Sequence, residues 1–555
     1  MDTISCDSGL PCSSRSSADG DYEQVADAED EKSMCGLSDL VSSCLSKNRS
    51  SIETEPFLRS SLFTGVQPTI RFYTKGTKVS KPNRKICSRV TWCHNSLLPI
   101  VMRQSLASSH FSIVDEHSFY VGYWGRHLKS AQYKTMMPYQ KINHFPGAFH
   151  IGRKDRLWTH ISNRQQHFGS EFDIIPRTYI LPNEKAALCE HLKGHPERYV
   201  IIKPPASARG TGISVTNKMK DICMKTPIIA QHYIHRPLTI NGAKFDLRFY
   251  AYCPCLEPLR VYIYNEGLVR FASVEYSTCL STVSNKYMHL TNYSINKLAE
   301  KDGVLDSPVP KWTLSELWEY FEEKGINSVD VRQRIDDVII KAFISCEKAI
   351  RDHMAKYLRY GFICHELFGV DILLDESLRP WLLEVNISPS LHSGTTLDAA
   401  VKGPLAKDVL NMAGIEVPPS QEEMLDADYT TRPGNLPKDD DHLVKEAAWV
   451  ASYKDEKKVD PRVLKRLSSE DVRMLVSFED EFRRKGNFEL VFPTSQTAYM
   501  QEYFPEPVYA NLLLQQWQIE HEADRSEGIA RLEMLCRQGH LGNRNQLLDL
   551  KRNGL

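Results

Sequence analysis

Apolar and polar positions alternate with different periods along this chain, and each change of period predicts an element. Residues 174–181 (IIPRTYIL) and 199–204 (YVIIKP) have strand patterns and flank a helical pattern, NEKAALCEHLKG, that ends at Gly194. Strand patterns follow in PIIAQHYI, KFDLRFYAYC and LRVYIYNEGLVRFASV, and the Asn-Glu-Gly of the last predicts a hairpin turn. Thr313 and Glu316 have capping-box spacing before one helix, and a second helix is expected over about 330–357. This mixture predicts an α/β (α+β) fold.

The same patterns divide the chain into five parts. Residues 1–65, rich in Ser, Asp and Glu, are expected to be a disordered leader. An N-terminal lobe is expected over 66–140, a central lobe over 141–226 and a C-terminal lobe over 227–416. Residues 417–555 have Pro-rich linkers and charged helical patterns, which predict a helical extension.

Composition narrows the class of protein. The 555 residues are 41% apolar, which is enough for several packed cores. The net charge of −1 gives no general attraction to nucleic acid or to a membrane surface. The fourteen cysteines form no C-x-x-C pair, and neither a signal peptide nor a membrane-spanning apolar run is present in the sequence. We therefore expect a soluble intracellular protein with reduced thiols and no nucleic-acid or membrane partner.

A late hairpin, CHELFGVDILLDESLRPWLLEVN, carries three oxygen-bearing side chains at facing positions. If its turn is centred between Ser377 and Leu378, Asp371 pairs with Glu384 across the strands. Asn386 then lies on the same face, because strand residues two apart share a face. Carboxylates among apolar residues need a compensating cation, and hard oxygen ligands favour Mg²⁺ over zinc. A solvated hairpin face is the alternative.

Basic side chains elsewhere suit the phosphates that usually accompany bound Mg²⁺. In KFDLRFYAYC, Lys244, Asp246 and Arg248 share one strand face, opposite the apolar residues. The stretch IIKPPASARGTGI contributes Lys203, Arg209, Gly210 and Gly212. Its glycines would let backbone N–H groups approach phosphate oxygens closely. The chain lacks P-loop, G-x-G-x-x-G and kinase signatures, so the sequence predicts a Mg-nucleotide site of another architecture.

Six stretches resemble, in family order, the tubulin tyrosine ligase-like family of the ATP-grasp superfamily of carboxylate-amine ligases. They are KINHFPGAFHIGRKDRL, IIKPPASARGTGI, QHYIHRPLTINGAKFDLRFY, EGLVRFAS, MHLTNYSINK and FGVDILLDESLRPWLLEVNISPSLHS, and they span about residues 141–414. The resemblance implies an ATP-grasp fold of N-terminal, central and C-terminal lobes. Family members add tyrosine, glutamate or glycine, and DVRMLVSFEDEFRRKGNFELVFP resembles the glutamylase branch.

The resemblance also implies a role for each matching position. The residues implied to bind ATP are Lys203, Arg209, Gly210, Gln231, His232, Tyr233, Ile234, Lys244, Asp246, Thr291 and Asn292. Those implied to bind the amino acid are Arg270, Tyr293, Ser294 and Lys402, of which Arg270 is also implied to be catalytic at the reacting acyl centre. Asp371, Glu384 and Asn386 match magnesium ligands, in agreement with the hairpin argument, and two Mg²⁺ ions are expected.

The resemblance implies an ATP-dependent protein glutamylase. A glutamate side chain of the acceptor becomes an acylphosphate, and the amine of free L-glutamate then displaces phosphate. The implied acceptors are the acidic tails of tubulin or microtubules, or other acidic proteins, on which the enzyme would start glutamate side chains. The basic stretch TKGTKVSKPNRKICSR is a candidate tail-binding surface, with a solvated loop as its alternative.

The enzyme is expected to act as a monomer in the cytoplasm at the cytoskeleton, with cilia, basal bodies and centrioles as further sites. The alternatives are a non-catalytic microtubule-binding protein of the same fold and a ligase for another amino acid or acceptor.

Overall fold

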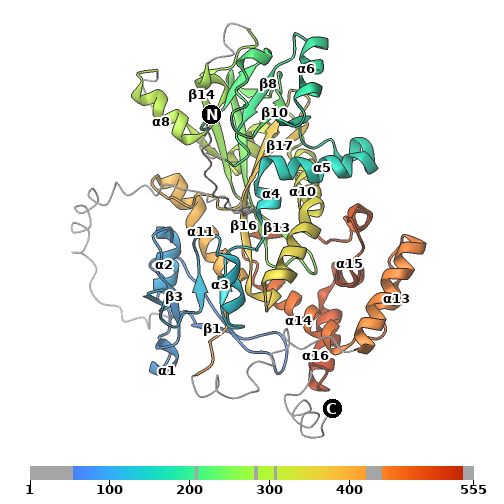
Figure 1. Ribbon diagram of the computed structural model, residues 1–555. Helices are drawn as coiled ribbons and strands as arrows, with labels where there is room; N and C mark the ends of the chain where they lie inside the picture. Colours follow the sequence, from blue (N-terminus) through green and yellow to red (C-terminus); the bar gives the residue numbers. More distant parts are fainter. Residues whose placement is uncertain (1–53, 207–209, 280–284, 305–308, 421–439, 542–555) are drawn as a thin grey trace, which may run out of the picture. The chain divides into compact units, whose positions relative to one another are not determined.

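The computed structural model describes residues 54–206, 210–279, 285–304, 309–420 and 440–541, which form a mixed α/β fold (Figure 1). The chain divides into Met1–Arg49 and a compact unit, Ser50–Leu555. Packed structure in that unit begins before the leader boundary predicted at residue 65, because Phe57 and Phe63 are buried in an apolar cluster. Residues 1–53 of the predicted leader lie outside the described residues. Among the helices of the described ranges, none is both long and apolar enough to cross a membrane.

The N-terminal lobe contains a small parallel sheet in the order β4-β3-β5-β6. Its strands are β3 (Thr91–Cys93), β4 (Ser112–Val114), β5 (Gly122–Tyr123) and β6 (Lys141–Ile142). The lobe also holds β1 (Leu58–Arg59), β2 (Thr69–Ile70), α1 (Arg84–Cys87), α2 (Ile100–Ser108) and α3 (Ser130–Thr135). Trp92 at the centre of β3 is fully buried in an apolar cluster that also includes Tyr250, Leu405 and Trp517, so this sheet shares its core with later parts of the chain.

A second, antiparallel sheet follows in the order β7-β10-β8-β9. Its strands are β7 (Thr178–Leu181), β8 (Val200–Lys203), β9 (Ser214–Thr216) and β10 (Ile228–His232). The neighbouring helices are α4 (Phe149–Gly152), α5 (Lys154–Phe168) and α6 (Lys185–Gly194), the last at the predicted position. Lys203 ends β8, as the pattern predicted. Because β10 pairs with β7 and β8, the sheet favours a lobe boundary after β10 and not at residue 226.

The largest sheet has eight strands and carries the three predicted metal residues. They are β11 (Thr239–Ile240), β12 (Ala243–Cys253), β13 (Val261–Tyr264), β14 (Leu268–Glu275), β15 (Lys311–Thr313), β16 (Glu366–Leu374), β17 (Pro380–Asn386) and β18 (Phe488–Phe492). Its helices are α7 (Lys286–His289), α8 (Tyr293–Lys301), α9 (Leu314–Glu323), α10 (Ser328–Tyr357) and α11 (Thr396–Met412). The predicted capping box of α9 is present, since the side chains of Thr313 and Glu316 bond each other's backbone N–H. Buried apolar residues of α10, including Ile339 and Phe343, share one core with β16 and β17.

The predicted hairpin at Asn-Glu-Gly is wrong, because β13 and β14 do not pair with each other. Ile263 of β13 pairs with Ala251 of β12, and Leu268 of β14 pairs with Arg248 of the same strand. β16 pairs with the other edge of β12, so β13 and β14 follow each other along one edge as an interrupted strand. Gly267 permits the interruption, since a Cβ there would lie 2.3 Å from the Arg248 carbonyl oxygen.

The β16–β17 hairpin pairs Asp371 with Glu384, as predicted, although its turn is not where we expected it. Near the turn, Leu374 pairs with Pro380, so the centre is Ser377 and not the Ser377–Leu378 bond. The register then shifts by one residue between Asp371 and Ile372. This β-bulge restores the predicted pair and places Leu383 and Glu384 together at the same pocket.

The C-terminal extension contributes both helices and a strand to the fold. Its helices are α13 (Asp440–Glu456), α14 (Ser469–Arg483), α15 (Tyr509–His521) and α16 (Arg525–Arg537). β18 pairs with β13, so the largest sheet is completed by the extension. Glu481 of α14 accepts two hydrogen bonds from Arg260 at 2.8 and 2.9 Å and one from the Tyr262 hydroxyl at 2.8 Å. The expected charged helical extension is therefore also part of the sheet's packing.

Candidate functional site

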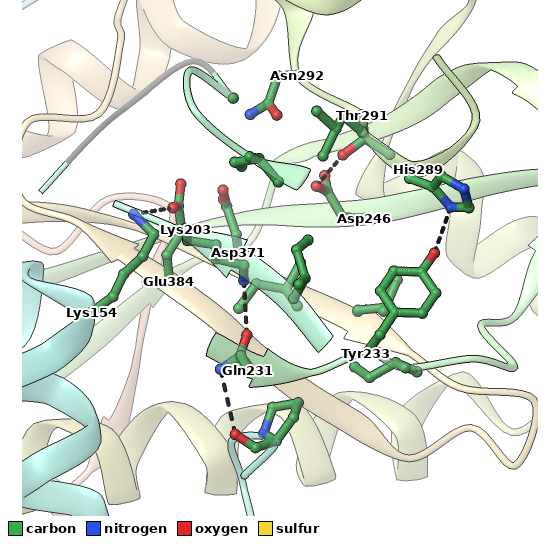
Figure 2. Close-up of a pocket in the computed structure, with 18 of the residues that line it drawn as sticks. Lys154, Lys203, Gln231, Tyr233, Asp246, His289, Thr291, Asn292, Asp371 and Glu384 are labelled. Atoms are coloured by element: carbon green, nitrogen blue, oxygen red, sulfur yellow. Dashed lines mark hydrogen bonds and ion pairs between the residues drawn. The ribbon is translucent and has the colours of Figure 1, made fainter. Parts of the chain in front are cut away.

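One pocket lies where β8 and β10 face β12, β16 and β17, and it gathers most of the predicted nucleotide residues (Figure 2). The predicted residues that line it are Lys203, Gly210, Gln231, His232, Tyr233, Ile234, Lys244, Asp246, Thr291, Asn292, Asp371 and Glu384. Arg209 lies outside the described residues. The predicted residues outside the lining are Arg270, Tyr293, Ser294, Asn386 and Lys402. The pocket therefore joins the predicted nucleotide and metal residues, and the predicted amino-acid residues lie beside it or further away.

Two neighbouring strands hold the first lysine in place. Lys203 Nζ donates to Gln231 Oε1 at 2.8 Å, and Gln231 Nε2 donates to Thr178 Oγ1 at 3.0 Å. Burial, together with the nearby Lys154 and Lys244 cations, lowers the pKa of Lys203 to about 8. Such a lysine, held by a neutral amide, retains its charge at neutral pH, and no carboxylate of the described residues is hydrogen-bonded to it, which suits a phosphate ligand.

The charged face of β12 supplies the opposite wall. Lys244 Nζ donates to the His289 carbonyl oxygen at 3.1 Å, and the Tyr233 hydroxyl lies 2.7 Å from His289 Nδ1. Burial lowers the pKa of Lys244 to about 8, partly opposed by Asp246. Asp246 in turn accepts a 2.5 Å hydrogen bond from the Thr291 hydroxyl. These bonds fix two of the predicted nucleotide-contacting residues, Lys244 and Asp246, on one strand.

The loop after β8 has the backbone conformation that its glycines permit. Gly210 and Gly212 have φ of 74° and 72°, values that favour glycine. A Cβ on Gly210 would lie 3.0 Å from Asn292 Oδ1, so the loop backbone approaches the HLTNYS segment closely. The Lys154 backbone N–H donates to the Pro205 carbonyl oxygen at 3.1 Å, which ties the start of α5 to the same loop.

The hairpin carboxylates meet three basic side chains at the inner end of the pocket. Asp371 accepts two hydrogen bonds from Arg248, at 2.5 and 3.0 Å, and forms a 2.7 Å ion pair with Arg270 Nη2. Glu384 Oε2 lies 2.9 Å from Lys154 Nζ. Burial alone would raise the pKa of Glu384, but Lys154 and other nearby cations outweigh it and lower the pKa below the usual range. The sequence predicted that carboxylates among apolar residues need a compensating cation. Two arginines and a lysine of the chain itself supply part of that positive charge.

These residues fit a magnesium ion chemically. Asp371 and Glu384 offer carboxylate oxygens at paired positions, and Asn386 Nδ2 donates to Glu384 Oε1 at 3.1 Å. With its amide turned over, Asn386 would offer the carbonyl oxygen that Mg²⁺ prefers. The set faces Lys203 and Lys244 across the pocket, so phosphate oxygens between them would complete the ligands.

Arg270 connects the pocket to its surroundings. Its Nε donates to Asp246 Oδ1 at 2.6 Å while Nη2 pairs with Asp371, and both acids line the pocket. A planar guanidinium can make both contacts at once. Arg270 therefore lies directly beside the nucleotide and metal residues, although it does not line the pocket itself.

The other predicted amino-acid residues lie on helices α8 and α11. Tyr293 begins α8, is followed by Ser294, and has 55% of its surface exposed. Lys402 of α11 donates to Asp398 Oδ1 at 2.8 Å. Lys311 Nζ lies 4.6 Å from the Tyr293 ring centre and 3.0 Å from Asp398 Oδ2. The structure thus links Tyr293 and Lys402 through Lys311 and Asp398.

Sequence reasoning assigned no role to Lys154, His289, Lys311 or Asp398. Lys154 lies in KINHFPGAFHIGRKDRL and His289 lies in MHLTNYSINK, two of the six stretches that resemble the family. Their place in these stretches was the only signal in the sequence that could have pointed to them. Lys311 lies in VPKWTL, just before α9, and no spacing rule connects it to Tyr293. Tertiary contact alone brings this lysine to the site.

A buried cluster of His127, His144 and Glu366 lies away from this pocket. His144 Nδ1 is 2.8 Å from Glu366 Oε1, and burial lowers the pKa of His144 to about 3 and raises that of Glu366 to about 8. The His127 and His144 rings stack with centroids 3.8 Å apart, so their in-plane lone pairs do not converge on one ion.

Comparisons with known proteins give the family and then named relatives within it. Residues 131–425 match the model of the tubulin-tyrosine ligase family, and the chain therefore belongs to this family. It is 59% identical to the tubulin polyglutamylase ttll-4 of Caenorhabditis elegans, over 96% of this chain and 98% of that protein. It is 40% identical to the human tubulin monoglutamylase TTLL4, over 88% of this chain and 42% of that protein. The family resemblance inferred from the six stretches is thereby confirmed, and it implies ATP and Mg²⁺.

Proposed function

We propose that this protein is an ATP-dependent tubulin glutamylase that joins free L-glutamate to glutamate side chains in acidic tubulin tails. The observation that carries the proposal is 59% identity to two tubulin polyglutamylases over 96% of the chain. The pocket supports it, because the hairpin acids and the phosphate-facing lysines are all present in the chain. The fold would be the ATP-grasp fold that the family implies.

ATP would lie between the two sheets. The β10 segment from Gln231 to Ile234 would hold the adenine, and Lys203 and Lys244 would pair with phosphate oxygens. The backbone N–H groups of the loop at Gly210 would approach the same phosphates. Lys154 lines this part of the pocket as well, so we add it to the phosphate-binding set.

Asp371, Glu384 and Asn386 would hold Mg²⁺, and we retain the expectation of two ions. Bound Mg²⁺ would neutralise phosphate charge during phosphoryl transfer. The chain's own part is to fix the carboxylates: Arg248 and Arg270 orient Asp371, and Lys154 orients Glu384. An ion arriving with ATP would compete with these basic groups, which would then be free to pair with phosphate oxygens.

The reaction needs activation because a carboxylate is a poor electrophile. The acceptor glutamate would attack the γ-phosphate to give an acylphosphate, and the amine of free glutamate would displace phosphate to form the amide. Arg270 lies beside the pocket acids Asp246 and Asp371, where it can stabilise charge on the reacting acyl group. Tyr293, Ser294 and Lys402 would contact the incoming amino acid, and Lys311 joins them through its contact with Tyr293. No protein nucleophile is needed, so positioning and charge carry the catalysis.

The acceptor would be a tail of tubulin, alone or in a microtubule, or another acidic protein, in the cytoplasm or at cilia, basal bodies or centrioles. The basic stretch near Lys75 and Arg84 remains our candidate surface for it. We propose that the enzyme acts as a monomer and starts side chains. Because the relatives bear both monoglutamylase and polyglutamylase names, the length of the added chain is part of the test below.

The proposal is tested by intact mass measurement of tubulin tails after incubation with the protein, Mg-ATP and equimolar glutamate, glycine and tyrosine. We expect additions of glutamate mass that are lost in Glu384→Gln, since this variant removes a carboxylate of the hairpin set. Addition of glycine or tyrosine instead would overturn the amino-acid assignment. Binding of ATP with no addition to tubulin would favour a different acceptor or the non-catalytic alternative.

A further inference from the structure

A single buried carboxylate joins the two lysines on the amino-acid side of the site. Asp398 is 4% exposed and lies in the first turn of α11. One of its oxygens accepts from Lys402 Nζ at 2.8 Å, and the other from Lys311 Nζ at 3.0 Å. Each oxygen thus has its own lysine. The two lysines come from β15 and α11, so the carboxylate connects two elements that are distant in sequence.

These lysines lie close to the residues that would handle the amino acid. Lys311 Nζ lies over the ring of the exposed Tyr293, 4.6 Å from its centre. Lys402 also donates to the His392 carbonyl oxygen at 2.6 Å and feels the positive charge of Arg248, which holds Asp371. Two cations held at fixed positions between Tyr293 and Arg248 match the side-chain carboxylate of a dicarboxylic amino acid.

We propose that Asp398 is a positioning residue that holds Lys311 and Lys402 for the side-chain carboxylate of the amino-acid substrate. The inference rests on the proposed function, in which glutamate is that substrate. Neither glycine nor tyrosine carries a second carboxylate, so a fixed lysine pair would favour glutamate over both. Asp398 itself need not touch the substrate.

Electrostatics explains why a carboxylate is needed between the lysines. Burial lowers the pKa of Lys402, and the hydrogen bond and charge of Asp398 oppose that shift, whereas Lys311 and Arg248 add to it. Without the carboxylate, Lys402 would face two cations while only 7% of its side chain is exposed. It would then lose its proton more readily, and Lys311, with 25% of its side chain exposed, could turn toward solvent.

Asp398 also takes part in the N-terminal cap of α11, and the experiment must separate this structural role from the positioning of the two lysines. Thr395 is the N-cap of α11, accepts from the Asp398 backbone N–H at 3.0 Å, and donates to Asp398 Oδ2 at 2.8 Å. Asp398→Asn retains the backbone donor and the shape of the side chain while it removes the charge. Thr395→Ala removes the cap and leaves the carboxylate, so the two variants separate capping from lysine positioning.

The kinetic experiment compares wild type, Asp398→Asn, Asp398→Glu and Thr395→Ala with tubulin as acceptor. We expect Asp398→Asn to raise the KM for glutamate by about tenfold or more, from the loss of one charge-assisted contact, with the KM for ATP within about twofold. Asp398→Glu should recover part of the loss, and Thr395→Ala should lower Tm with a KM for glutamate within about threefold of wild type. A KM for glutamate that stays within about twofold in a folded Asp398→Asn protein would overturn the inference.

Two further measurements distinguish the positioning role of Asp398 from helix capping and from the choice of acceptor. In Asp398→Asn the alkaline rise in the KM for glutamate should occur at lower pH than in wild type, which loss of a helix cap would not produce. Calorimetric binding of L-glutamate, with Mg²⁺ and a non-hydrolysable ATP analogue, needs no acceptor. Weaker binding in the variant without tubulin modification by wild type would contradict the proposed acceptor and support the positioning role. Equal binding by both proteins, or no binding by wild type, would overturn the role of Asp398.

Discussion

Two buried ion clusters on the largest sheet have similar contacts and different surroundings. Asp371 is held by Arg248 and Arg270, and Glu481 is held by Arg260, all within hydrogen-bonding distance. Asp371 lines the pocket, whereas Glu481 does not line it and is covered by the packing of α14 on the sheet. A buried ion pair therefore does not identify a site by itself. Access to a ligand distinguishes a group used in chemistry from one used in packing.

The strongest test of this comparison is Asp371→Asn. Loss of one hairpin carboxylate should lower the single-turnover rate of glutamate addition by about 1,000-fold, because metal-assisted charge stabilisation is worth several kcal/mol. The free energy of unfolding should fall as well, since Arg248 would remain buried without its carboxylate, so the rate and not the stability carries this test. Rates within about tenfold of wild type, at saturating ATP and Mg²⁺, would show that Asp371 belongs with the packing cluster.

Loss of stability without loss of catalysis is expected for Glu481→Gln. Arg260 would remain buried without its carboxylate, so the free energy of unfolding should fall by about 3 kcal/mol. Urea denaturation followed by fluorescence measures this loss. The KM for ATP and for glutamate, taken where the variant is still folded, should match wild type. A large rise in either KM with unchanged stability would contradict the distinction drawn here.

Arg270→Lys tests a residue that does not line the pocket itself but contacts two acids that do, Asp246 and Asp371. A lysine retains the charge but cannot bond Asp246 and Asp371 together as the guanidinium does. We expect the rate at saturating ATP and glutamate to fall about 100-fold, the lower end for loss of one transition-state donor. Single-turnover kinetics with tubulin provides the measurement. Full activity of the lysine variant would exclude a need for bidentate geometry.

The smallest expected effect concerns pH. The pKa of Lys203 and of Lys244 is lowered to about 8, and only the protonated amines attract phosphate. Neutral lysine becomes more abundant as pH rises through about 8, so the KM for ATP should rise about threefold to tenfold between pH 7 and 9. Lys203→Arg, which stays charged over this range, should show a flatter profile. A KM for ATP independent of pH would mean that neither lysine changes its protonation on binding phosphate, which would contradict this explanation.

The parts of the site that follow strand alternation were accessible from the sequence. The shared face of Lys244, Asp246 and Arg248 and the pairing of Asp371 with Glu384 needed the period of a strand and a turn position. The pairing of Asp371 with Glu384 was predicted correctly because the β-bulge offset the error in the predicted position of the turn. Lys311 and Lys154 were not found, because their roles depend on contacts between distant elements. β18 was missed within a region of charged helical pattern, where a five-residue strand has little signal of its own.

The pairing of β18 with β13 has a consequence for how the protein is made. During synthesis the β16–β17 hairpin leaves the ribosome long before Phe488–Phe492, so β13 first presents an unpaired edge. Exposed strand edges invite association with other chains, and nascent proteins with such edges depend on chaperones. A message truncated after the hairpin would therefore yield an aggregation-prone product and not a smaller active enzyme. Every functional copy therefore requires translation through β18.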